Sequence, residues 1–231
     1  MSSDILIPDE LFRPMQLTPL SQTEAFHYLH EGWKLIFQNY PDFKQLRILW
    51  AHTALETANF GICRNLNLGN IKKTPGHFWT MYRSHEYDAQ GNIHIYDPPH
   101  IQTGFNAYTD PLLAAKEYIE FLKNRSRYVT AWAQLVNGNA KEYIYELGNH
   151  GYFSAPPDKY YANVMYWLKI FDANYQKFLD AEPKLPPKED SKPPEEPPKE
   201  PLPPPISGKY QEPGFWDRIF ILLRNIFLNF R

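Results

Sequence analysis

The sequence predicts a mainly helical α+β domain, followed by a proline-rich segment and a short C-terminal amphipathic helix. Three observations predict this class. Apolar residues recur at helical spacing behind capping residues through most of residues 21–180. Residues 77–96 change to an aromatic and β-branched pattern that is typical of strands. Twelve of the 22 prolines lie between positions 183 and 213, so the chain is not one uniform globule.

The N-terminal elements follow from turn and capping residues. Residues 1–20 hold three prolines and no helical period, and we expect an extended lead-in packed on the domain. The stretch Ser21–Glu24 matches a capping box, which predicts that a first helix starts there. A second helix should begin behind Asp42 and run to about Asn59, with Gly61 as its stop.

The centre of the chain predicts one small β-lobe between helices. The segments within residues 77–96 flank a turn at Asp88–Gly91, which predicts a β-hairpin. Helices resume at Asp110, an N-cap with Pro111 at the first helical position. The remaining helices are expected over residues 127–137, 139–147 and 158–180, with Gly148 ending the second of them.

The C-terminal fifth of the chain predicts a spacer and an attachment helix. Residues 181–213 are rich in proline and charge, favour polyproline II and should act as a semi-rigid spacer. Residues 214–231 place large apolar side chains on one side of a helix and arginines opposite. Such a helix lies on a membrane surface, binds a protein partner or docks on its own domain, and the sequence leaves all three open.

Composition excludes several classes. A net charge of −2 supplies no basic field for nucleic acid. Cys63 is the only cysteine, and the eight histidines show no ligand-like spacing, so we expect no disulfide framework, metal or cofactor. The N-terminus has no basic segment followed by an apolar one, and no apolar stretch reaches 18 residues. We therefore expect synthesis in the cytoplasm without a secretory signal or a membrane span.

Glu56 is the first candidate for chemistry. It stands near the C-terminal end of an apolar helix, where partial desolvation and the helix dipole both raise the pKa of a carboxyl group. A raised pKa is what a general acid needs in order to hold its proton near neutral pH. From position alone, a glutamate that faces solvent is the competing interpretation.

The residues around Glu56 favour the first interpretation. The stretch ALETANFG at 54–61, followed by NLGNIK at 67–72, resembles the "ALES.WG … NLFGIK" signature of the bacterial glucosaminidases of glycoside hydrolase family 73. Further pieces resemble that family in the same order, over about residues 45–170. They lie at 84–87, 105–108, 114–128 and 151–161. This chain departs from the family at Asn70, which replaces a glycine, and at residues 153–158.

The resemblance implies a lysozyme-like fold and a set of site residues. Glu56 resembles the general acid of the family, Glu86 the carboxylate of the hairpin lobe, and Tyr152 the cleft tyrosine. Asn70 and Tyr108 match motif positions near the cleft. Glu86 would activate water, unless the acetamido group of the sugar takes that role.

Aromatic residues on the predicted hairpin lobe offer two interpretations. Trp79 and Tyr82 could stack on sugar rings, whose C–H faces are apolar, or could pack in the core. Neither interpretation is favoured by the sequence.

The resemblance implies cleavage of β-1,4 bonds in the glycan strands of peptidoglycan, so the protein would act at the bacterial cell wall. Glucosaminidase, muramidase and lytic transglycosylase chemistry all stay open. A phage lysis enzyme or virion-associated hydrolase would fit a chain without a signal segment. The competing class is a catalytically inactive lysozyme-like module that binds glycan or serves as a structural part of a phage particle or secretion machine.

Overall fold

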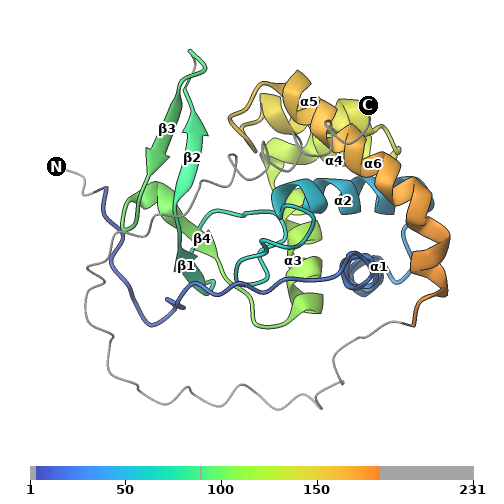
Figure 1. Ribbon diagram of the computed structural model, residues 1–231, viewed down its shortest axis with the longest axis horizontal. Helices are drawn as coiled ribbons and strands as arrows, with labels where there is room; N and C mark the ends of the chain where they lie inside the picture. The colour runs from blue at the N-terminus through green and yellow to red at the C-terminus, as the bar shows by residue number, and fades with distance from the viewer. Residues whose placement is uncertain (1–3, 89, 183–231) are drawn as a thin grey trace, which may run out of the picture. The chain divides into compact units, whose positions relative to one another are not determined.

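The computed structural model describes residues 4–88 and 90–182. The predicted spacer and terminal helix lie outside the described residues. The mainly helical α+β class is confirmed: the described residues form six α-helices and two small antiparallel sheets (Figure 1). The helices are α1 (Gln22–Phe37), α2 (Phe43–Glu56), α3 (Pro111–Asn124), α4 (Val129–Val136), α5 (Ala140–Asn149) and α6 (Pro157–Asp180). The strands are β1 (Trp79–Met81), β2 (Ser84–Tyr87), β3 (Ile93–Tyr96) and β4 (Gly104–Asn106), and two short 3-10 turns cover Ile101–Thr103 and Ser126–Tyr128.

Three helix starts are confirmed by their caps. Ser21 and Glu24 exchange both bonds of a capping box at the start of α1. Asp42 accepts from the backbone N–H of Gln45 at the start of α2. Asp110 accepts from the backbone N–H of Leu113 at the start of α3, where the first helical residue is proline. Local side-chain chemistry therefore determines where these helices begin.

Helix α2 is the centre of the core. It packs on α6 and α1, while α1 packs on α3 and α4 on α5. Trp50, in the middle of α2, is fully buried, donates its indole N–H to the Gln22 carbonyl at 3.1 Å and contacts aromatic rings from α6. Most of α2 is buried from Leu46 onward, so a polar side chain at its C-terminal end is largely shielded from water.

The predicted end of α2 is wrong by three residues. The helix stops at Glu56, and Ala58, Asn59 and Phe60 follow in left-handed conformation, with φ of 47°, 59° and 63°. Gly61 does not end the helix. Tertiary contacts stabilise this left-handed segment, because Phe60 is fully buried and Asn59 accepts a 2.8 Å hydrogen bond from Gln22 of α1. Glu56 thus becomes the last helical residue.

The predicted single hairpin is in fact two sheets. β2 and β3 form the hairpin, with Ser84 opposite Tyr96 and Tyr87 opposite Ile93. β1 pairs instead with β4, which lies beyond the hairpin in sequence. Local periodicity cannot reveal such a non-local pairing. Gly91, in the predicted turn, has a φ of 82°.

Residues 4–20 hold no helix and contact the domain through isolated β-bridges. Isolated bridges join Ile5 to His100, Phe12 to Trp79 and Leu17 to Arg64.

The later helices differ slightly from expectation, since α5 continues past Gly148. The described residues contain no helix that is both long enough and apolar enough to cross a bilayer.

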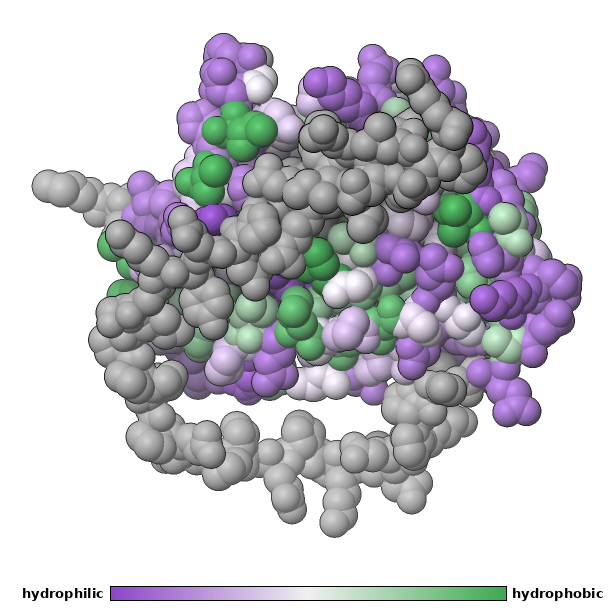
Figure 2. All heavy atoms as spheres, in the orientation of Figure 1, coloured by the Kyte–Doolittle hydropathy of each residue, from purple (hydrophilic) through white to green (hydrophobic). Residues whose placement is uncertain are grey.

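The two faces of the β2–β3 hairpin differ in character. Ile93 and Ile95 are exposed by 52% and 57%, and Figure 2 shows apolar side chains over the hairpin. Since side chains alternate along a strand, these isoleucines share a face with His85 and Tyr87. Glu86 therefore points to the opposite face of the hairpin.

Candidate active site

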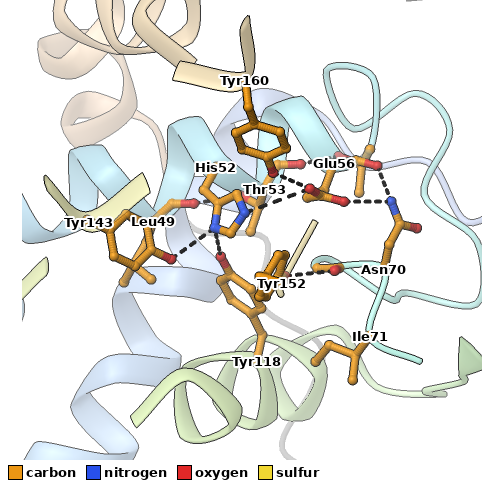
Figure 3. Close-up of polar contacts among 12 residues, drawn as sticks. Leu49, His52, Thr53, Glu56, Asn70, Ile71, Tyr118, Tyr143, Tyr152 and Tyr160 are labelled. Atoms are coloured by element: carbon orange, nitrogen blue, oxygen red, sulfur yellow. Dashed lines mark hydrogen bonds and ion pairs between the residues drawn. The ribbon is translucent and has the colours of Figure 1, made fainter. Parts of the chain in front are cut away.

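Glu56 lies at the end of α2 with its carboxyl group held by side chains from distant segments (Figure 3). The Asn70 amide donates to the Glu56 backbone carbonyl at 2.6 Å and to Glu56 Oε2 at 3.0 Å. Because a backbone carbonyl only accepts, the first bond identifies which end of the Asn70 amide carries the hydrogens. Asn70 has a left-handed φ of 47°, which asparagine tolerates better than most residues.

Tyr160, on α6, donates its hydroxyl to Glu56 Oε1. The sequence analysis gave Tyr160 no role. The only feature that could have pointed to it is its place in the 151–161 segment, which carries part of the family resemblance. Both carboxyl oxygens of Glu56 are therefore hydrogen-bonded, and only 12% of the side chain is exposed.

Burial changes the acidity of Glu56. Desolvation is the largest cause and raises its pKa to about 7, while the hydrogen bonds from Tyr160 and Asn70 lower it and the charge of Glu86 raises it. The carboxyl group can therefore hold a proton near neutral pH and release it while the Tyr160 and Asn70 donors stay in place.

The raised pKa of Glu56 makes the stability of the fold depend on pH. The unfolded chain loses this proton near pH 4.5, whereas the folded protein keeps it to about pH 7. The contribution to the free energy of unfolding is thus fully present below about pH 4.5 and is lost as the pH rises through about 7. We expect the urea midpoint of the wild type to fall more between pH 4.5 and pH 8 than that of Glu56→Gln. Equal pH dependence in the two proteins would contradict the raised pKa.

Tyr82 positions Asn70. Its hydroxyl donates to Asn70 Oδ1 at 3.0 Å, so the Asn70 amide is held at both ends. The Tyr82 ring stacks on Phe105 with centroids 3.9 Å apart, and the Arg64 guanidinium lies over it. Tyr82 is buried, so these neighbours occupy its ring in place of a sugar.

Glu86, on β2, forms a second carboxylate centre. Its Oε1 lies 2.8 Å from Lys72 Nζ, and its Oε2 accepts from the Ser154 hydroxyl at 3.0 Å. The Ser154 hydroxyl also accepts from the Tyr87 backbone N–H at 2.9 Å, which ties β2 to the segment between α5 and α6. The Glu86 side chain is 31% exposed, so water reaches this carboxylate far more easily than Glu56.

Tyr152 lies beside the Glu56 centre without bonding to it. Its hydroxyl donates to the Gly69 carbonyl at 2.8 Å, next to Asn70 in sequence. Its ring contacts His52 of α2, with centroids 4.9 Å apart. The structure thus gives Tyr152 contacts that support the loop carrying Asn70.

Two further predicted binding residues are, like Tyr82, in the protein interior. Tyr108 is buried in a cluster with Leu66 and Ala114. Trp79 is fully buried, and its indole donates to Asp9 of the lead-in at 2.6 Å. Of the two interpretations left open for Trp79, core packing is the one observed: no face of its ring is open to a sugar, because the N-terminal lead-in packs across β1.

The chemistry available at the site rests on carboxyl, hydroxyl and amide groups. Within residues 4–88 and 90–182, no three His, Cys, Asp or Glu side chains gather as a metal site would require. Cys63 is buried, and burial raises the pKa of its thiol to about 12, which makes it a poor nucleophile.

Comparison with known proteins gives a similar solved structure. No protein-family model and no curated protein matches this chain. Among solved structures, the chain is similar to the catalytic domain of the autolysin Auto from Listeria monocytogenes. The TM-score is 0.45 at 15% sequence identity, over 68% of this chain and 88% of that one.

Proposed function

We propose that this protein is a glycoside hydrolase that cleaves β-1,4 bonds in the glycan strands of peptidoglycan, with Glu56 as its general acid. The observation that carries the proposal is the state of Glu56: nearly buried, hydrogen-bonded at both oxygens and with a pKa raised to about 7. Glycosidic cleavage needs a carboxylic acid of this kind to protonate the departing oxygen. The substrate class is supported by the resemblance of residues 54–61 and 67–72 to family 73 glucosaminidases.

The surroundings of Glu56 also suit the carboxylate that remains after the acid has protonated the departing oxygen. Once the proton has left, the carboxylate keeps two donors already in place, the Tyr160 hydroxyl and the Asn70 amide. Preorganised donors of this kind stabilise a developing charge without reorganising. They lower the cost of ionising a buried acid during the reaction.

Glu86 is the proposed base. Lys72 and Ser154 orient its two oxygens, and its partial exposure gives water access. A carboxylate in this setting can take a proton from an attacking water. The acetamido group of an N-acetylated sugar is the competing source of assistance.

We expect Glu86→Gln to reduce the rate of peptidoglycan cleavage about 100-fold, because the amide cannot accept the proton. Glu120→Gln is a matched control. Glu120 is 33% exposed and lies 2.9 Å from Lys116, much as Glu86 is 31% exposed and lies 2.8 Å from Lys72. Initial rates of dye release from labelled peptidoglycan compare the variants. A loss below threefold for Glu86→Gln would assign the second role to the substrate.

Digestion of purified peptidoglycan tests the function and identifies the bond. Mass spectrometry of borohydride-reduced fragments separates the three chemistries by their new ends. Reduced N-acetylglucosamine indicates a glucosaminidase, reduced N-acetylmuramic acid a muramidase, and an anhydro sugar a lytic transglycosylase. If neither the wild type nor Glu56→Gln releases fragments, the hydrolase proposal is wrong and a binding module takes its place.

A further inference from the structure

A buried histidine lies one turn before Glu56 on α2. His52 is fully buried, and its Nδ1 lies 2.7 Å from the Tyr118 hydroxyl and 2.9 Å from the Tyr143 hydroxyl. Its other nitrogen, Nε2, has no hydrogen-bond partner and lies 3.8 Å from Glu56 Oε1 (Figure 3). A buried polar atom without a partner is costly and calls for an explanation.

The ring of His52 is neutral. Burial lowers its pKa to about 3, so the ring carries a single proton near neutral pH. Burial also raises the pKa values of Tyr118 and Tyr143, so both hydroxyls keep their protons. The open question is which nitrogen of His52 holds the hydrogen.

The two tyrosines favour a proton on Nε2. The hydroxyls of Tyr118 and Tyr143 both lie within hydrogen-bond distance of Nδ1, at 2.7 and 2.9 Å. If Nδ1 accepts, it takes the hydrogen of one of these hydroxyls. If Nδ1 donates, neither hydroxyl hydrogen has an acceptor, because the described contacts of Tyr118 and Tyr143 supply no other. The ring proton then lies on Nε2, the nitrogen nearest Glu56.

We propose that His52 is a positioning residue whose Nε2–H donates to the Glu56 carboxylate once the acid has released its proton. The 3.8 Å gap exceeds a hydrogen bond, but a shift of about 1 Å by the carboxylate closes it. In this arrangement Tyr118 and Tyr143 hold the imidazole, and the imidazole becomes a third donor beside Tyr160 and Asn70. The catalytic meaning of this contact rests on the proposed function, whereas the contact itself does not.

Other ionisable groups lie near His52 and Glu56, on several elements that pack around these two residues. Those that influence Glu56 or contact His52 are Tyr82, Glu86, Tyr118, Tyr143, Tyr152 and Tyr160. Burial raises the pKa of each of these tyrosines, so they stay neutral across the range in which Glu56 titrates. Glu86 is the one carboxylate among them, and it is common to all variants compared below.

The experiment is a ¹³C NMR titration of the Glu56 carboxyl carbon in the wild type, His52→Gln and His52→Asn. A glutamine amide reaches the place of Nε2 and keeps a donor toward Glu56, whereas an asparagine amide reaches only the place of Nδ1. We expect His52→Asn to raise the midpoint by about one pH unit and His52→Gln to leave it within about 0.3 units. The signal is assigned by its loss in Glu56→Gln.

Thr53→Val is the control for a change in the same buried turn. Thr53 is fully buried, and its hydroxyl donates only to backbone carbonyls of α2, so the Glu56 midpoint should not move. Equal shifts in the Asn and Gln variants, or no shift in either, would overturn the proposal. ¹⁵N shifts of wild-type His52 provide a test that needs no variant, because a proton on Nδ1 would also overturn it.

The titration needs no substrate, so the two proposals can fail separately. A shifted midpoint in a protein that releases no peptidoglycan fragments supports the His52 contact and refutes the hydrolase. Fragment release with an unmoved midpoint supports the hydrolase and refutes the His52 contact.

Discussion

Glu56→Gln is expected to reduce peptidoglycan cleavage about 1,000-fold while the fold is retained. The amide has nearly the shape of the carboxyl group, and its oxygen can still accept from Tyr160. It cannot deliver a proton to the departing sugar oxygen, and nothing else at the end of α2 replaces it. Initial rates on purified peptidoglycan, with circular dichroism and thermal unfolding on the same sample, measure both parts of the prediction.

Glu120→Gln again serves as the control, since it also exchanges a carboxyl group for an amide, at a surface ion pair with Lys116. Its rate should stay within twofold of the wild type. A Glu56→Gln protein that retains more than a tenth of the wild-type rate would remove Glu56 from the role of general acid.

Gly69→Ala is expected to destabilise the fold by about 2 kcal/mol and to lower Tm by about 4–8 °C. A Cβ atom at this position would lie 2.7 Å from the Tyr118 ring and 2.7 Å from the Tyr152 hydroxyl. Both rings are packed against His52, so neither can move away without disturbing the site. We expect the rate of cleavage to fall together with Tm, because Gly69 precedes Asn70.

Gly61→Ala is the matched control for Gly69→Ala. It lies in the same region beyond α2, but its added Cβ would meet only the Ala58 carbonyl oxygen, at an ordinary 3.5 Å. Its stability should change by less than about 0.5 kcal/mol. Calorimetry measures Tm. Equal Tm values for Gly69→Ala and the wild type would contradict the prediction, because they would mean that the structure around Tyr118 accommodates the added Cβ without cost.

Several features of this protein follow from short stretches of sequence. The starts of α1, α2 and α3 are determined by Ser21, Asp42 and Asp110, because a cap satisfies free N–H groups two or three residues away. The class of the fold follows from apolar spacing in the same way. Glu56 could be singled out because its position at a helix end and the surrounding residues are both local information.

Other features were decided by tertiary structure. Tyr160 reaches Glu56 across 104 residues, and Asn70 is held by Tyr82 as well as by Glu56. The pairing of β1 with β4 and the burial of Trp79 under the lead-in likewise depend on segments that are distant in sequence.

The physical reason is the range of the interactions. Periodicity and capping act within one or two turns, so the sequence shows them directly. Desolvation depends on everything that packs around a group, and it is the largest cause of the raised pKa of Glu56. Local sequence therefore identifies Glu56 as a candidate acid, whereas its protonation near neutral pH depends on the packing of the whole fold around it.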